Sequence, residues 1–153
     1  MPAIYQMIRD LAAYERALPE VTGTEQQLSQ ALFGAEPAVF AHVAEDNGEL
    51  AGFALWFINY STWQGQHGVY LEDLYVRPEL RGAGYGRQLL AELAALCVEH
   101  GYGRLDWAVL DWNEPARGFY ARLGAVRQDD WTIHRLAGHS LHALAAARAP
   151  EPG

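Results

Sequence analysis

The chain has 153 residues, of which half are apolar and a fifth are charged, and its formal net charge is −8. This length is enough for one domain with a sizeable core, and an acidic chain without a basic run is a poor partner for nucleic acid. The single cysteine, Cys97, excludes an internal disulfide framework and a multi-cysteine metal site, and the histidines show no metal-ligand spacing, so no metal is expected.

The first half of the chain has patterns for two helices followed by three strands. Apolar residues recur at helical spacing from Ile4 to about Ala17. Thr24 and Gln27 form a capping-box pair for a second helix that ends near Phe33. Alternating or apolar runs predict strands over 38–44, 50–60 and 69–76, with a hairpin turn at 46–49 and a loop at 61–68.

The second half alternates helices and strands. The main helix is expected from Gly84 to about His100, where Gly101 ends it. A short strand at 105–110, a helix capped by Asn113 and a strand at 127–136 should complete the sheet. An alanine-rich helix over 140–148 and a Pro-rich tail from about 149 follow. Without repeats or a linker, this order predicts a single α/β (α+β) domain over residues 1–153.

The most informative segment is Arg81-Gly82-Ala83-Gly84-Tyr85-Gly86, between the strand at 69–76 and the main helix. Glycines before a helix leave backbone N–H groups unobstructed, and the helix N-terminus adds roughly half a unit of positive charge. This combination predicts an anion cradle, most economically for a pyrophosphate. The glycine spacing fits neither the P-loop nor the dinucleotide fingerprint. A glycine turn that only caps a helix is the plain alternative.

A second motif follows the strand at 105–110 and reads Asn113-x-x-Ala116-x-x-Phe119-Tyr120-x-x-x-Gly124. Asn113 can cap a helix at its third position, and Gly124 can end that helix in a left-handed conformation. An ordinary amphipathic helix explains Phe119 on the inner face. It does not explain why Tyr120 stands seven residues after Asn113.

Together, the two motifs resemble the GNAT superfamily of N-acetyltransferases, whose acetyl-coenzyme A loop has the spacing Arg81-x-x-Gly84-x-Gly86. The segments 60–65, 70–73 and 108–113 resemble its diamine acetyltransferase branch, which includes spermidine/spermine and thialysine acetyltransferases. Ser61-Thr62-Trp63 looks more like the thialysine type. The spermidine type has an acidic residue where Thr62 stands, so long polyamines are not the expected substrates.

The resemblance runs from about Ile4 to Trp131 and implies a fold. We expect the GNAT fold, with a central mixed, mostly antiparallel sheet whose strands splay apart and whose faces are covered by helices. Family members begin with a strand before the first helix. That strand is missing here because the helix starts almost at Met1, and we expect a start site assigned too far downstream.

The resemblance also implies the activity, which is direct transfer of acetyl from acetyl-CoA (coenzyme A) to a small primary amine, either a thialysine- or lysine-like amino acid or a short diamine or polyamine. Substrate contacts are expected from Tyr14, Glu15, Trp63, Glu72, Asp106 and Asp129. Cofactor contacts are expected from Leu74, Tyr75, Val76, Arg81, Gly82, Ala83, Gly84, Tyr85, Gly86, Arg87, Asn113, Glu114, Ala116 and Tyr120. The backbone N–H near Leu74 is a candidate oxyanion donor.

Two side chains are the catalytic candidates. An alkylamine with a pKa near 10.4 is neutral in only about one molecule in two thousand at pH 7, so a base is useful, directly or through water. Glu72 is that candidate, and the alternative is a solvent-facing polar residue. Strand alternation puts Asp73 on the opposite face, where it should support the sheet. Tyr120 is the candidate acid for the leaving thiolate, with simple hydrogen bonding to the sulfur as the alternative.

The remaining expectations concern binding partners and cellular location. The branch resemblance implies a homodimer. No signal segment opens the chain and no run of 18 apolar residues occurs, so we expect a cytoplasmic protein without a membrane partner. Two alternatives remain open: an acetyltransferase acting on a protein or peptide amine, and a coenzyme A-binding sensor or interaction module without turnover.

Overall fold

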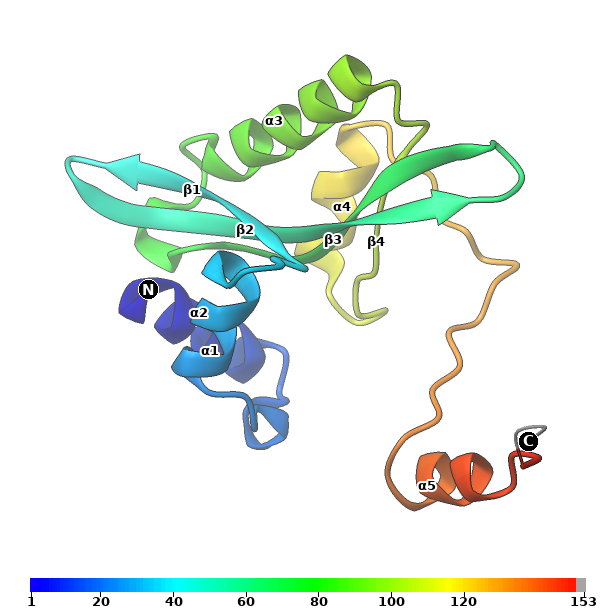
Figure 1. The fold of residues 1–153 in the computed structure, drawn as a ribbon. Coiled ribbons are helices and arrows are strands. Elements are labelled where there is room, and N and C mark those ends of the chain that lie inside the picture. Colours follow the sequence, from blue (N-terminus) through cyan, green and yellow to red (C-terminus); the bar gives the residue numbers. More distant parts are fainter. Residues whose placement is uncertain (151–153) are drawn as a thin grey trace. The chain divides into compact units, whose positions relative to one another are not determined.

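The computed structural model describes residues 1–150, which belong to two compact units, Met1–Trp112 and Asn113–Gly153 (Figure 1). The first unit holds the sheet and three α-helices. The second holds two further α-helices. None of the helices in residues 1–150 is long and apolar enough to cross a lipid bilayer.

The first unit is built on a four-stranded sheet in the order β1-β2-β3-β4. Its strands are β1 (Phe40–Asp46), β2 (Glu49–Ser61), β3 (Gln66–Val76) and β4 (Leu105–Trp107). The β1–β2 and β2–β3 pairs are antiparallel, and β4 runs parallel to β3. The predicted mixed, mostly antiparallel sheet is therefore confirmed.

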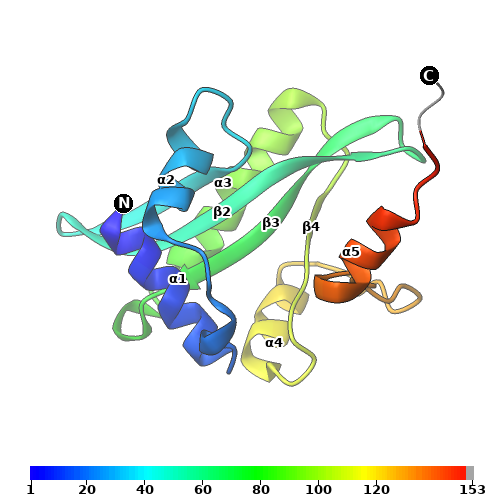
Figure 2. The same cartoon turned by 60° about the horizontal axis from the view of Figure 1, so that its bottom comes forward.

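Helices cover both faces of this sheet. Figures 1 and 2 show α1 (Pro2–Tyr14) and α2 (Glu25–Phe33) on one face and α3 (Tyr85–His100) on the other. Two short 3-10 turns, Leu18–Glu20 and Pro78–Leu80, connect elements. On the first face, α1 packs its apolar side onto β2 and β3, and the buried cluster there consists of Ile4, Met7, Phe53, Leu55 and Tyr75.

Local sequence signals explain where the helices begin and end. The Thr24 hydroxyl accepts a hydrogen bond from the Gln27 backbone N–H at 3.1 Å, and the Gln27 side chain accepts one from the Thr24 N–H at 2.8 Å, so the predicted capping box is formed. Helix α3 follows Gly84 and ends at Gly101, both in the left-handed conformation. Its inner side buries Leu89, Leu90, Leu93 and Cys97.

A β-bulge interrupts the pairing of β2 with β3. Asp73 lies opposite Leu55 and Leu71 lies opposite Trp56, which leaves Glu72 as an extra residue in β3. Asp73 thus shares the α1 face with Leu55. Glu72, which alternates with Leu71, lies on that face too. The prediction that Glu72 and Asp73 occupy opposite faces was wrong, because it assumed an unbroken strand.

The bulge is also where the parallel strands separate. β4 pairs with β3 only through Val69–Leu71, and in the described residues no strand pairs with 72–76 on the β4 side. This confirms the splayed strands. It also explains why β4 ends at Trp107 rather than at residue 110, since a strand lasts only as long as its partner stays beside it.

The second unit contains α4 (Glu114–Arg122) and α5 (Gly138–Ala146). The predicted strand at 127–136 was wrong, because residues 126–137 contain no strand in the structure. Arg127 and Asp129 form an ion pair with each other at 3.0 Å, and Trp131 and Ile133 are exposed. Alternating apolar residues do not make a strand without a neighbouring strand to complete the hydrogen-bond ladder.

Candidate functional site

The loop before α3 has the geometry of an anion cradle. Gly82 and Gly84 both adopt left-handed backbone angles, with φ of 87° and 91°. A Cβ built at either glycine has no atom within 4 Å, so the space in front of the loop is open. The first turn of α3 carries no acidic residue, which leaves the positive end of the helix uncompensated. Two left-handed glycines at a helix N-terminus fit a diphosphate.

Side chains around the cradle attach it to the sheet. Arg81 donates a hydrogen bond through Nε to the Val76 carbonyl at 2.9 Å. Its guanidinium lies 5.5 Å from the ring centroids of both Tyr14 and Tyr75. The Tyr85 hydroxyl is hydrogen-bonded to Asp46, which raises the Tyr85 pKa. The loop is thus tied to the end of β3, to α1 and to the β1–β2 turn.

Three carboxyl groups come together where β3 leaves β4. Glu15 caps the C-terminal end of α1, and the bulge turns Glu72 and Asp73 toward the same face of the sheet. Burial raises the pKa of Asp73 to about 7, with further contributions from the Glu72 and Glu15 carboxylates. Burial also raises the pKa of Glu15, followed by the effect of Glu72. The Glu72 carboxylate therefore makes ionisation of both Asp73 and Glu15 harder, and Glu15 adds to the effect on Asp73.

This group can accept a proton near neutral pH. A carboxyl with a pKa close to the working pH exists in both forms, which is what a general base requires. Asp73 was expected only to support the sheet, and in the structure burial instead raises its pKa to about 7. The sequence did not indicate that Asp73 would join Glu72 on this face, because the bulge depends on pairing with β2, which lies earlier in the chain.

Asp106 lies at the margin of this region. It is opposite Tyr70 in the β3–β4 register and forms a 3.3 Å ion pair with Arg104. The pKa of Tyr70 is raised by burial and then by the carboxylates of Glu72 and Asp106. Asp106 and Glu72 therefore both act electrostatically on the Tyr70 hydroxyl.

Tyr14 belongs to an aromatic contact next to the carboxyl groups. Its ring centroid lies 6.0 Å from that of Trp112, and the guanidinium of Arg16 lies 4.3 Å from the Trp112 centroid. Trp63, in contrast, is 85% exposed in the β2–β3 turn. Since β3 begins at Gln66 and rises ~3.3 Å per residue, Glu72 lies roughly 20 Å further along it. The structure does not bring Trp63 to the carboxyl groups.

The second unit carries the other predicted residues. Asn113 caps α4 by accepting a hydrogen bond through Oδ1 from the Ala116 N–H at 3.3 Å. Glu114 forms an ion pair with Arg117 at 3.0 Å. Tyr120 is partly buried beside Phe119, with ring centroids 5.5 Å apart. The expected Asn-capped helix is confirmed. Asp129, a predicted substrate contact, is paired with Arg127 as described above.

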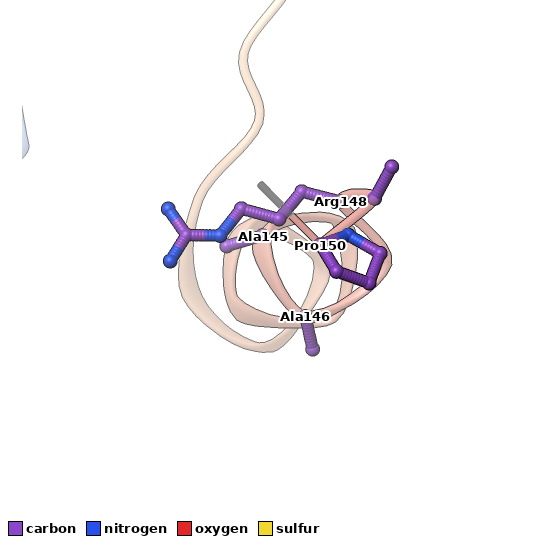
Figure 3. Close-up of a pocket in the computed structure, with 5 residues that line it drawn as sticks. Ala145, Ala146, Arg148 and Pro150 are labelled. Atoms are coloured by element: carbon purple, nitrogen blue, oxygen red, sulfur yellow. The ribbon is translucent and has the colours of Figure 1, made fainter. Parts of the chain in front are cut away.

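Other features of the described residues offer less chemistry. A surface hollow at the end of α5 is lined by Ala145, Ala146, Arg148, Ala149 and Pro150 (Figure 3). Its lining contains no acid, nucleophile or aromatic ring. Burial raises the pKa of the Cys97 thiol, which suits a structural role. No group of three His, Cys, Asp or Glu side chains within residues 1–150 could hold a metal ion.

Comparison with protein families gives a match to the acetyltransferase (GNAT) family over residues 4–125. The chain is 37% identical to a thialysine N-epsilon-acetyltransferase from Bos taurus, covering 93% of this chain and 89% of the relative. It is 40% identical over 95 residues to an L-ornithine N5-acetyltransferase from Arabidopsis thaliana, covering 62% of this chain and 42% of that protein.

Among solved structures, the fold is similar to an integron cassette protein from the mobile metagenome of V. cholerae. The TM-score is 0.75 at 29% sequence identity, and the match covers 90% of this chain and 86% of the other. An aminoglycoside acetyltransferase from a soil metagenome shares the fold at a TM-score of 0.71 and 18% identity, with 90% and 88% coverage.

Proposed function

The chain belongs to the acetyltransferase (GNAT) family and is an N-acetyltransferase, and we propose that it transfers acetyl from acetyl-CoA directly to a small primary amine. The observation that carries this proposal is the three-carboxyl group at the point where β3 leaves β4. A cationic amine is attracted to such a group, and the same group can take its proton.

The cradle is the proposed site for the cofactor. When bound, acetyl-CoA supplies an acetyl group activated as a thioester. Gly82, Gly84 and the first N–H groups of α3 would hold its diphosphate, which their left-handed geometry and open space support. The unpaired side of β3 at Leu74 offers backbone groups for the pantetheine arm and an N–H for the thioester oxygen. Tyr75, Val76, Ala83, Tyr85, Gly86, Arg87, Asn113, Glu114 and Ala116 complete the proposed cofactor contacts.

Deprotonation of the amine is assigned to the carboxyl group. Glu72 is exposed and can act through a water molecule, while Asp73 is more buried and has the pKa near neutrality. We assign Glu72 to contact with the incoming ammonium and Asp73 to storage of its proton. The neutral amine would then attack the thioester carbon, and the carbon–sulfur bond would break with its electron pair leaving on the sulfur. The attacking nitrogen would release its second proton to solvent as the amide forms.

Tyr120 is the proposed acid for the leaving thiolate. A phenol with an ordinary pKa of about 10 can donate its proton as negative charge builds up on sulfur. The helix that carries it is capped by Asn113, which fixes its first turn. The proton gained by the carboxyl group passes to solvent, and the phenol is reprotonated from solvent, so the cycle returns to its start.

The acceptor class is supported by the relatives. Thialysine and L-ornithine, which are named for two of them, are both amino acids with a side-chain amine. The proposal therefore covers lysine-like amino acids and short diamines. A protein or peptide amine, and coenzyme A binding without turnover, are the competing functions. We also propose that the protein is cytoplasmic and that it forms a homodimer. The diamine branch implies the homodimer, and light scattering on the purified chain would test it.

The test is release of coenzyme A thiol from acetyl-CoA with a panel of acceptors containing thialysine, lysine, putrescine, spermidine and a peptide. Saturable release with a small amine, slowed in Tyr120→Phe and Glu72→Gln, is expected. Turnover only with the peptide would favour a macromolecular acceptor. Tight acetyl-CoA binding without turnover on any acceptor would favour the sensor function.

A further inference from the structure

Arg16 occupies a backbone position that does not suit it. Helix α1 ends at Tyr14, and the chain then turns through Arg16, which has a left-handed φ of 61°. The Arg16 N–H donates to the Ala13 carbonyl at 3.1 Å, and the Ala17 N–H donates to the Ala12 carbonyl at 2.8 Å. These two bonds form a Schellman motif, whose left-handed residue is usually glycine. An arginine at this place is a poorer choice for the backbone than glycine.

The Arg16 side chain has a defined position. Its guanidinium carbon lies 4.3 Å from the centroid of the Trp112 ring, which itself contacts the Tyr14 ring. Stacking on an aromatic face orients the planar guanidinium and leaves the N–H groups at its edge directed outward. In the part of the chain that the structure describes, the ion pairs do not include Arg16.

Glu15, the neighbour of Arg16, suits a cationic ligand, whereas Arg16 suits an anionic one. Glu15 belongs to the three-carboxyl group with Glu72 and Asp73. A guanidinium that neutralised Glu15 would lower the pKa of that carboxyl, whereas burial and Glu72 raise it. The Arg16 guanidinium instead lies over the Trp112 ring. Two adjacent residues at one helix end present a carboxylate and a guanidinium as separate binding surfaces.

We propose that Arg16 binds the carboxylate of the acceptor, so that the preferred substrate is an amino acid with a side-chain amine rather than a diamine. The carboxyl group receives the amine end, and the stacked guanidinium receives the carboxylate end with bidentate geometry. A diamine has a second cation at that end, which the Arg16 charge repels. The inference rests on the proposed function, because it names the acceptor of the same amine site.

The test uses lysine and 1,5-diaminopentane, which is lysine without its carboxylate. Coenzyme A release is measured with both substrates for the wild type and for Arg16→Gln, Arg16→Lys and Trp112→Leu. Arg16→Gln should lower kcat/KM for lysine about tenfold, mainly through KM, since it removes a charge-assisted contact. For the diamine, kcat/KM should be unchanged or a few-fold higher. Arg16→Lys should retain part of the lysine activity, and Trp112→Leu should raise the KM for lysine by freeing the guanidinium.

A matched control is Arg9→Gln, which removes the same charge from within α1, seven residues earlier in the chain. It should leave the ratio of the two kcat/KM values unchanged. Equal effects of Arg16→Gln on both substrates, or a wild-type preference for the diamine, would overturn the assignment while leaving the acetyltransferase function intact. Absence of turnover with either substrate would contradict the proposed function, and the assignment would fall with it. Because Arg16 is exposed, its variants are expected to fold.

Discussion

Replacing Asp73 with asparagine should stabilise the protein, and only at high pH. The ordinary pKa of this carboxyl is 3.8, and in the folded chain it is about 7. The folded protein therefore binds more protons than the unfolded chain between these values, and the slope of the free energy of unfolding against pH is negative there. The cost of the ionised Asp73 carboxylate is absent below pH 3.8 and complete above about pH 7.

The size of this effect follows from the pKa difference. The pKa of Asp73 rises from 3.8 to about 7, a difference of about 3. Since one pKa unit corresponds to about 1.4 kcal/mol, the ionised carboxylate can lower the free energy of unfolding by at most about 4 kcal/mol. Burial is the largest cause of the shift, but Asp73 is only partly buried and Glu72 is exposed. Solvent therefore lowers the burial cost and screens the repulsion, and we expect roughly 2 kcal/mol at pH 8. For a chain of this size, that is a rise in Tm of roughly 4–8 °C.

The assay is urea unfolding of wild type and Asp73→Asn in a series of buffers from pH 4 to pH 8. The two proteins should have nearly equal stability at pH 4, and the variant should gain stability steadily up to about pH 7. Glu99→Gln, which removes an exposed carboxylate from α3, is the control and should show no such trend. A variant that is destabilised at pH 8, or a difference that does not change with pH, would refute the buried-carboxylate reasoning.

Three further predictions concern turnover. The kcat/KM of the wild type should rise with pH through an apparent pKa near 7, and Asp73→Asn should lose this rise. A pH profile that is the same in both proteins would exclude Asp73 as the group that stores the proton. Tyr120→Phe should lower kcat about 100-fold with little change in the KM for the amine, and unchanged kcat in steady-state assays would remove the acid role. Gly84→Ala, at φ 91°, should raise the KM for acetyl-CoA about tenfold, whereas Gly48→Ala, which also has a positive φ, should not.

The features predicted well are those determined within a few residues. The Thr24 capping box, the glycine loop before α3 and the Asn113 cap depend on short-range hydrogen bonds and backbone angles, so their residue types indicate them directly. The sheet and its splayed strands were expected through the family resemblance.

The features missed depend on partners that are distant in the sequence. The bulge at Glu72 exists only in relation to the register of β2, and it changes which face Asp73 occupies. The segment 127–136 has strand-like alternation, but alternation does not supply a neighbouring strand. The left-handed conformation of Arg16 was not predicted either, since glycine is the usual signal for that position.

Direct transfer of acetyl to the side-chain amine is the central claim, and the product itself tests it. Acetyl-CoA carrying isotopically labelled acetyl is incubated with lysine and the purified protein, and the products are identified by mass spectrometry. The account predicts labelled lysine acetylated at its side-chain amine, formed in equal amount to free coenzyme A. Coenzyme A released with labelled acetate alone, or label bound covalently to the protein in place of the amine, would contradict it.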